Sequence, residues 1–427
     1  MTTIPDLPER IDLVNELHAR PFPTLSAPSR AAYLAVKRPK DAATRSRKAD
    51  KDHLLDLLRR LGATQMPGEN ATHYFGEIGK YRLKWESHTE FVTYTLFGDP
   101  SETQPFDGDF FDVFPEDWLA DLPGQRMTSA LIRVDLMKDR ATMHDELRSW
   151  FVGESLAASS VLDGLAVIAT DFRLDSAGHV RMAMFVDESC GARRIGRIVQ
   201  RLTEIETYKS MSMLGLTMAR GLNRDLNGIE DRLSELTDAM AREDAAPEGT
   251  LRKLLPLSSE LEALASNTGF RFGATGAYEA LVHQRVQVLR EMRFEGRQTF
   301  NEFMMRRFDP AMRTVKSAEK RLEQMTQRAV RASELLRTRV DVDRSAQNQA
   351  LLESMDRRAD LQLRLQKTVE GLSVVAISYY AVSLALYFLG PIAEAKLLSK
   401  AWLATLVVPP VVFLVWRMLQ RVHKSME

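Results

Sequence analysis

The sequence predicts an α+β protein in three successive parts: an N-terminal mixed α/β domain with antiparallel hairpins, a long-helix bundle or stalk, and a C-terminal two-helix transmembrane hairpin. Three patterns support this prediction. Short apolar runs rich in β-branched and aromatic residues recur before Gly191, apolar residues then recur every three or four positions, and two uncharged stretches follow Glu370. These patterns are typical of strands, amphipathic helices and membrane spans, respectively.

The same patterns place the boundaries between the parts. At 427 residues the chain exceeds a typical domain of about 100 to 200 residues, so more than one unit is expected. The predicted parts are a cytoplasmic α/β domain at 1–190, a long-helix bundle and stalk at 191–370, a transmembrane hairpin at 371–416 and a basic cytoplasmic tail at 417–427.

The composition excludes several classes of protein. With 44% hydrophobic and 27% charged residues, the chain is not a multi-span transporter made mostly of lipid-facing helix. Lys and Arg together number 58, as do Asp and Glu, so no nucleic-acid partner is expected. The single cysteine, Cys190, excludes an intramolecular disulfide and a multi-cysteine metal site, as is typical of a reducing compartment. Residues 1–10 show no signal-peptide pattern, so the body is expected in the cytoplasm.

Residues 1–190 read as strands with two covering helices. Gly, Asp and Pro separate the apolar runs, and the short connections at 79–80 and 175–178 predict antiparallel hairpins. The helices are expected at Lys48–Leu61 and Met143–Leu156. The predicted strands are Ala31–Lys37, Thr72–Ile78, Tyr81–Ser87, Phe91–Leu96, Ala130–Leu136, Leu165–Phe172 and Val180–Val186.

Beyond Gly191 the periodicity predicts helices alone, each with one apolar stripe. The series from Val315 to Leu336 covers about three heptads, which favours an intramolecular bundle, with a coiled coil or a homo-oligomer through the long helices left open. Helix breaks are predicted at 245–249, at 267–269 and at Asp309-Pro310. No Pro or Gly then occurs before Gly371, so a stalk of roughly 90 Å is expected to lead into the first span.

Two uncharged stretches predict the membrane hairpin, with spans at 371–391 and 401–416. The first stretch has no charge as far as Ala393 and would extend roughly 35 Å as a helix, which exceeds a hydrocarbon core of about 30 Å. The second would extend only about 24 Å, although flanking Lys and Arg can snorkel. Because Pro409 and Pro410 lie inside it, a re-entrant or interfacial segment is the alternative.

Basic residues flank the outer ends of the two spans. Arg and Lys lie before the first span and after the second, while Glu394 accompanies the two lysines of the connection. Cytoplasmic flanks carry an excess of Lys and Arg, so a multi-pass protein of the bacterial inner membrane is predicted, with both termini cytoplasmic. The lipid bilayer is thus the expected partner of residues 371–416.

Two compact polar clusters are the candidate sites. Imidazole beside carboxylates could bind a divalent metal or transfer protons. Neither cluster has the spacing of a known metal or hydrolase motif, so no catalytic, cofactor-binding or metal-ligating role is assigned and no cofactor is expected. The clusters span 16–21 and 85–91, and the candidates are Glu16, His18, Arg20, Trp85, Glu86, His88 and Glu90.

The densest acidic stretch, Asp99–Asp121, could suggest a calcium loop. The twelfth position counted from Asp107 is Trp118 rather than the bidentate Glu of such a loop. A solvated loop anchored by its aromatic residues is predicted instead.

Together the two polar clusters, the segment Leu202–Leu216 and the closing pair of spans resemble a proteobacterial family of predicted membrane-anchored proteins. The resemblance covers nearly the whole chain. That family has no established activity, so the resemblance implies a bacterial inner-membrane location and no particular reaction. The positions that it would mark as a shared site, without assigned roles, are Glu16, His18, Arg20, Pro21, Trp85, Glu86, His88 and Glu90.

The order of the parts is also similar to that of pentameric two-span magnesium transporters. The Gly-Met-Asn motif of that family, which carries ion selectivity at the end of the first span, is replaced here by Leu389-Gly390-Pro391. Selective magnesium transport is therefore in doubt, and a two-span chain would need an oligomer to enclose a pore.

The leading hypothesis is a membrane-anchored, cytoplasm-facing protein of unknown biochemical activity, which acts as an interaction or scaffolding module for a protein partner. One alternative is an oligomeric two-span ion transporter or channel. Another is a metal-dependent enzyme or sensor in which His18 and His88 meet. Whether the protein is an enzyme stays open, with the absence of a catalytic motif favouring a non-enzyme.

Overall fold

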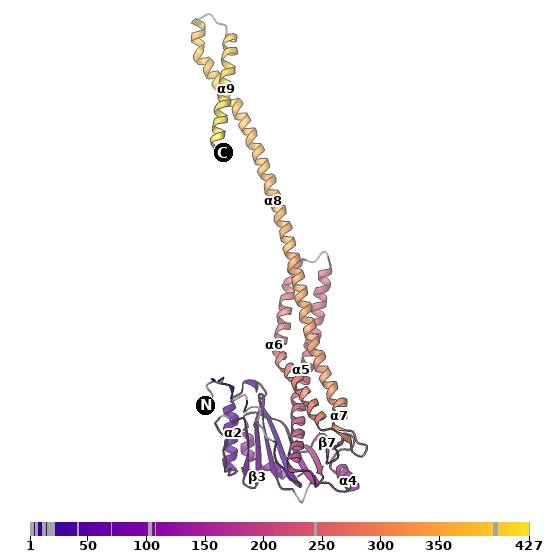
Figure 1. Ribbon diagram of the computed structural model, residues 1–427. Coiled ribbons are helices and arrows are strands. Elements are labelled where there is room, and N and C mark those ends of the chain that lie inside the picture. The colour runs from indigo at the N-terminus through magenta and orange to yellow at the C-terminus, as the bar shows by residue number, and fades with distance from the viewer. Residues whose placement is uncertain are drawn as a thin grey trace. The chain divides into compact units, whose positions relative to one another are not determined.

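A single mixed sheet forms the centre of the N-terminal part (Figure 1). The computed structural model describes residues 4, 7–10, 14, 22–40, 42–69, 71–100, 105–106, 108–242, 246–395 and 400–426. The strands are β1 (Ser29–Lys37), β2 (His73–Ile78), β3 (Tyr81–Ser87), β4 (Phe91–Gly98), β5 (Gln125–Leu136), β6 (Ala157–Val161), β7 (Ala166–Leu174), β8 (Val180–Val186) and β9 (Met292–Arg293). Their order across the sheet is β2-β3-β4-β1-β5-β8-β7-β6-β9.

The helices follow the predicted α+β order. They are α2 (Arg47–Arg60), α3 (Glu116–Ala120), α4 (Arg140–Trp150), α5 (Ala192–Ala241), α6 (Pro247–Val288), α7 (Phe300–Phe303), α8 (Asp309–Ala395) and α9 (Lys400–Met426). The described residues also form the short 3-10 turns η1 (Ala42–Thr44) and η2 (Gly108–Val113) and a π turn, η3 (Met304–Phe308). The α+β class is confirmed.

The sheet consists of two halves with the same succession of elements. Each half has a strand, a helix and a three-stranded antiparallel meander whose last strand pairs with the first strand of that half. The β1–β4 pair is antiparallel, whereas the β5–β8 pair is parallel, so the sheet is mixed. The halves join through the antiparallel β1–β5 pair at the centre of the sheet.

All seven predicted strands and both predicted hairpins are present, and two strands were not predicted. β6 has the sequence Ala-Ala-Ser-Ser-Val, which lacks the large apolar residues that signal a strand. β9 has two residues and pairs with β6 at the edge of the sheet. It lies beyond Gly191, so the prediction of helices alone in that region was wrong.

The two faces of the sheet are covered by different helices. Alternate residues of β1 point to opposite faces, so Leu34 packs with α2 whereas Tyr33 bonds to Thr207 of α5. Trp85, Tyr94 and neighbouring apolar residues fill the core under α2, η2 and α3. A second cluster packs α4 against β6, β7 and β8. Burying one large apolar side chain contributes about 1.5–3 kcal/mol, so these clusters dominate the stability of the sheet.

Close contacts at two glycines fix α5 against its neighbours. A Cβ atom at Gly196 would lie 1.6 Å from the carbonyl oxygen of Pro23, and one at Gly215 would lie 2.3 Å from Oγ1 of Thr275 on α6. Leu25 N donates to the Ala192 carbonyl at 3.1 Å, which ties the same segment to the start of α5. Glycine is therefore needed at both positions for this packing.

One of the three predicted helix breaks, at 267–269, was wrong. The break between α5 and α6 is present, but α6 continues through 267–269, where the Thr268 hydroxyl donates to the Leu264 carbonyl at 2.7 Å. A single glycine costs a helix only about 1 kcal/mol, which packing offsets. α8 begins at Asp309, as predicted for Asp309-Pro310, and it follows directly on η3 and on α7, which has a capping box on Thr299. The wider π turn η3 directly precedes the proline, where an ordinary turn would clash with its ring.

The chain divides into two compact units, Met1–Ala241 with Arg252–Ala332, and Arg242–Leu251 with Ser333–Glu427. The single helix α8 is 87 residues long, and α9 stays helical through Pro409 and Pro410. Two stretches of the described chain, within Phe300–Gly390 and at Ala401–Met418, are long and apolar enough to cross a membrane.

Candidate functional site

The predicted cluster at 85–91 occupies the end of β3 and the turn into β4, and its side chains point in different directions. Trp85 is 1% exposed and belongs to the core under α2. Glu86 points to the opposite face, where its Oε1 lies 3.1 Å from Nζ of Lys84. His88 stacks on Phe91 with ring centroids 4.4 Å apart. These residues are therefore neighbours in sequence that do not share one site.

A buried arginine holds the turn that carries His88 and Glu90. Arg45 Nε donates to Oδ2 of Asp50 at 2.7 Å, and Nη2 donates to the Phe91 carbonyl at 3.0 Å. The same guanidinium also donates to the carbonyls of His88 and Thr89. Burial raises the pKa of Asp50, whereas the Arg45 charge opposes this rise. Arg45 thus fixes the backbone of the turn through hydrogen bonds to three of its carbonyl groups.

Glu90 is the centre of a buried polar group between the sheet and α6. The residue is 2% exposed, forms an ion pair with Arg271, and accepts a hydrogen bond from the Tyr278 hydroxyl at 3.2 Å. Tyr278 stacks on Tyr208 of α5 with centroids 5.8 Å apart. Burial raises the pKa of Tyr278, and the adjacent Glu90 carboxylate raises it further, so this tyrosine is a neutral donor.

The polar contacts continue along the α5 face of the sheet. Nζ of Lys84 donates to Oε1 of Gln200 at 2.7 Å, and the Thr128 hydroxyl donates to Oε1 of Glu206 at 3.0 Å. Arg285 of α6 pairs with Glu204 of α5. A charge-assisted hydrogen bond is about twice as strong as a neutral one, so this layer attaches α5 and α6 to the sheet at fixed positions.

The other predicted candidates, Glu16, His18 and Arg20, lie outside the described residues, as does Pro21. A site shared by His18 and His88 therefore stays a prediction. Within the described ranges, no group of three or more His, Cys, Asp or Glu side chains is arranged to hold a metal ion.

Sequence reasoning missed Arg45, Arg271 and Tyr278, which organise the Glu90 cluster. Arg271 and Tyr278 are two of many polar residues along α6. Polar residues on a helix normally indicate a face that is exposed to solvent, so the sequence does not single these two out. Arg45 stands in a short connection with no motif around it. Only the pairing of distant segments, 181 residues apart for Arg271 and Glu90, identifies these residues.

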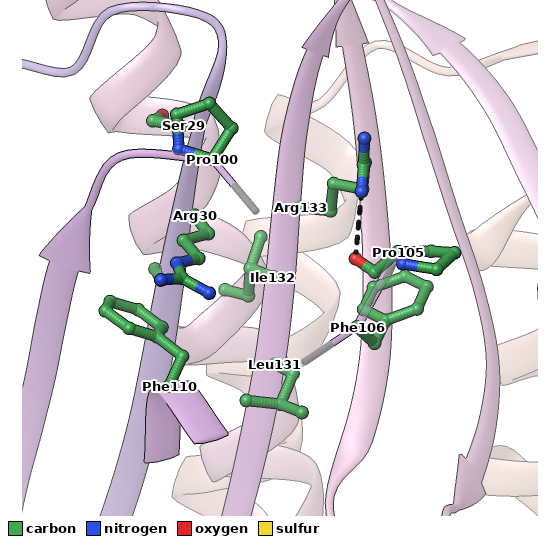
Figure 2. Close-up of a pocket in the computed structure, with 10 residues that line it drawn as sticks. Ser29, Arg30, Pro100, Pro105, Phe106, Phe110, Leu131, Ile132 and Arg133 are labelled. Carbon is green, nitrogen blue, oxygen red and sulfur yellow. Dashed lines mark hydrogen bonds between the residues drawn. The ribbon is translucent and has the colours of Figure 1, made fainter. Parts of the chain in front are cut away.

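Aromatic residues do anchor the acidic stretch, as predicted, but η2 and α3 lie within it, so the prediction of a loop was wrong. Phe110, Phe111 and Trp118 are 2%, 6% and 0% exposed. Arg30 lies over the Phe110 ring at 4.2 Å, beside a small cavity between β1, β5 and this segment (Figure 2). Figure 2 also shows Nη1 of Arg133 donating to the Pro105 carbonyl, at 3.4 Å. The cavity volume is about 20 Å³, enough for one water molecule and too small for a substrate.

Two buried histidines make the stability of the sheet sensitive to acid. Nε2 of His53 donates to the Trp118 carbonyl at 3.0 Å, and Nδ1 accepts from the Tyr94 hydroxyl at 3.1 Å. His179 Nδ1 lies 2.9 Å from the Ser129 hydroxyl. Burial lowers the pKa of both imidazoles, so the folded state favours their neutral forms.

We expect the free energy of unfolding to fall as the pH drops below about 6.5, the ordinary histidine pKa. Stability falls because, as the pH drops, the two imidazoles are protonated first in the unfolded chain. In the folded chain they stay neutral until the pH reaches their lower pKa. Replacing His53→Asn should reduce the slope of unfolding free energy against pH in this range, as measured by denaturation of the full chain in detergent. The partly exposed His144→Asn is the matched control, and an unchanged slope in the His53 variant would contradict the assignment.

One family model, described as a protein of unknown function (DUF3422), matches residues 5–426. No curated protein matches the sequence. Because the family model covers nearly the whole chain, from the sheet to α9, the protein belongs to the DUF3422 family of proteins of unknown function.

Proposed function

We propose that this protein is anchored in a bacterial inner membrane by α8 and α9 and acts as an interaction or scaffolding module on the cytoplasmic side. The observation that carries the proposal is the exposure of the apolar C-terminal helices. In each of the two candidate spans, only 6% of the most apolar 18-residue window is buried. The core helix of a soluble protein would be mostly buried, so another medium must cover these side chains.

The exposed side chains of the first span are large and apolar. Leu372 and Val375 are both 70% exposed, and Phe388 is 80% exposed. All the backbone hydrogen bonds of a helix are internal, so such a segment can enter hydrocarbon without unpaired polar groups. The stretch without charges would extend roughly 35 Å, which is sufficient for a bilayer core of about 30 Å.

The second span is shorter and packs with the first. Val374 of α8 lines an apolar cavity of about 430 Å³ together with residues of α9, including Val408, Pro409 and Trp416. Figure 1 shows α9 turning back beside the end of α8. Because α9 stays helical through Pro409 and Pro410, its continuous length of 27 residues supports a full span rather than a re-entrant segment.

The interaction role rests on the part of α8 that precedes the first span. Every residue from Asp341 to Val369 is exposed, including several leucines. Leu351, Leu352 and Met355 are 61%, 66% and 59% exposed. A helix that presents this much apolar surface to water is typical of a segment that packs on another chain. The positions of Arg and Lys outside the two spans support a cytoplasmic location for this segment.

The test combines membrane extraction with protease access. The full chain should stay in the membrane pellet after alkaline carbonate washing, whereas a chain that ends at Glu370 should move to the supernatant. Protease added outside intact spheroplasts should spare the N-terminal unit, and protease added to inverted vesicles should digest it. Release of the full chain by carbonate would reject the anchor, and digestion from outside would reject the orientation.

A further inference from the structure

An open cavity lies where the two halves of the sheet join, at the end of β1 and the start of β5, and α5 and α6 form its other walls. Its volume is about 470 Å³, within the range of about 300–1,000 Å³ that holds small molecules. Four of its lining residues are basic, Lys37, Arg38, Arg126 and Arg271, and none is acidic. The apolar residues of its lining include Met127, Leu214 and Met218.

An irregularity in the β1–β5 pairing shapes this end of the sheet. Ala35 pairs with Thr128 and Val36 with Arg126, so Met127 is the extra residue of a bulge. Just before it, a Cβ atom at Gly124 would lie 2.9 Å from the Lys37 carbonyl carbon, so only glycine allows the two strands to approach here. Bulges redirect side chains, which explains how consecutive residues of β5 come to line one cavity.

Three of the four basic side chains are held by backbone carbonyls rather than by carboxylates. Nη1 of Arg126 donates to the Ala177 carbonyl at 3.2 Å, Nε of Arg38 donates to the Pro123 carbonyl at 3.0 Å, and Nζ of Lys37 donates to the Arg38 carbonyl at 3.0 Å. The Arg126 guanidinium also lies against Gly178, whose φ of +84° and missing Cβ leave room for it. Among the described residues, Lys37, Arg38 and Arg126 form no ion pair with a carboxylate, so backbone carbonyls alone orient these three side chains.

The fourth basic residue, Arg271, has an unsatisfied donor. Nη2 pairs with Glu90, but Nη1 is buried and has no hydrogen-bond partner in the part of the chain that the structure describes. An unsatisfied buried donor costs about 1–3 kcal/mol. Burial lowers the pKa of Lys37, and the nearby Arg271 charge lowers it further, as expected where like charges crowd one site. An anion in the cavity would relieve the crowding of like charges around Lys37 and Arg271.

We propose that this cavity binds a phosphate-type anion carried by a molecule with an apolar group. The arginines offer the planar donors that recognise phosphate oxygens, and Lys37 adds a point charge. Met127, Leu214 and Met218 would contact the apolar group. Four basic residues line the site and Glu90 pairs with one of them, so the excess of positive charge favours a dianion over chloride.

Calorimetric titration of the full chain in detergent tests the site, with inorganic phosphate and phenyl phosphate as probes in chloride buffer of constant ionic strength. Phenyl phosphate should bind more tightly than inorganic phosphate. Leu214→Ser should reduce the difference in affinity between the two probes, because it removes an apolar contact to the phenyl group. Lys37→Gln and Arg126→Gln should each weaken phenyl phosphate binding about ten-fold or more, equivalent to about 1.4 kcal/mol. The exposed Lys253→Gln and Arg313→Gln are charge-matched controls, and thermal unfolding verifies that each variant folds.

A second arm identifies the source of the anion. Phosphatidylcholine vesicles with and without phosphatidic acid are added to the purified protein, and phenyl phosphate is used as competitor. If the wild type binds vesicles with phosphatidic acid, if phenyl phosphate displaces it from them, and if Lys37→Gln and Arg126→Gln both abolish this binding, the site is supported and its ligand is a lipid headgroup. Binding to soluble phenyl phosphate alone would support the site with a free phosphate ester. Equal binding by the wild type and both cavity variants, or no binding of any probe, would overturn the proposal.

Discussion

Replacing Arg45→Ala is expected to lower the free energy of unfolding by about 3–5 kcal/mol, because removing one partner of a buried ion pair leaves the other charge uncompensated. Arg45 and Asp50 have side chains that are each 3% exposed. The substitution also removes the donors to the carbonyls of His88, Thr89 and Phe91. Folded domains are stable by only about 5–15 kcal/mol, so this loss is a large share of the total. Chemical denaturation of the full chain in detergent measures it.

The control for this prediction is Arg47→Ala, an exposed arginine two residues along the chain, which should change stability by less than about 0.5 kcal/mol. Hydrogen exchange provides a local measurement. Amides at 88–91 should exchange faster in the Arg45 variant, since the turn loses its anchor, while those at the centre of β5 follow global stability. A loss below about 1 kcal/mol would show that the Arg45 contacts do not hold the turn.

Replacing Glu90→Ala is expected to have a similarly large effect, about 3–5 kcal/mol, because Arg271 would remain buried without its partner. The Arg271 side chain is 11% exposed and that of Glu90 is 3% exposed, so water cannot substitute for the lost carboxylate. The Tyr278 hydroxyl would lose its acceptor as well. Denaturation and the near-ultraviolet signal of the stacked Tyr208 and Tyr278 measure the change.

A double-mutant comparison separates the pair from the rest of the packing. The variant Glu90→Gln with Arg271→Met removes both charges of this pair, so it should be more stable than Glu90→Ala alone. Glu262→Ala, on the exposed face of α6, is the matched control and should be near neutral. If the double variant were the least stable of the three, charge burial would not be the cause of the loss.

Much of the secondary structure could be predicted because it depends on local patterns. The runs at 81–87 and 180–186 alternate or cluster apolar residues as buried strands do, and both are strands with the predicted bounds. β6 and β9 could not be predicted, because small residues or a two-residue length give no periodic signal. The break predicted at 267–269 was wrong although a local signal was present. Packing of α6 overrides the weak local preference of one glycine against helix.

The candidate site could be predicted only in part. Glu90 was singled out from its sequence neighbours, but its actual partners come from α6 and are remote in sequence. Trp85 and Glu86 are adjacent and face opposite sides of β3, so sequence proximity gave the wrong grouping. Residues next to each other on a strand point apart, whereas residues far apart in the chain meet across layers.

By itself, the sequence determined the α+β class, the hairpins and the two apolar C-terminal helices, because each follows from the spacing and hydropathy of residues close together in the chain. Only the tertiary structure decided which charges are buried, which of them are paired, and which gather around the cavity at the β1–β5 junction. The reason is that burial and ion pairing depend on the distances between separate elements, and the order of strands in a sheet sets those distances.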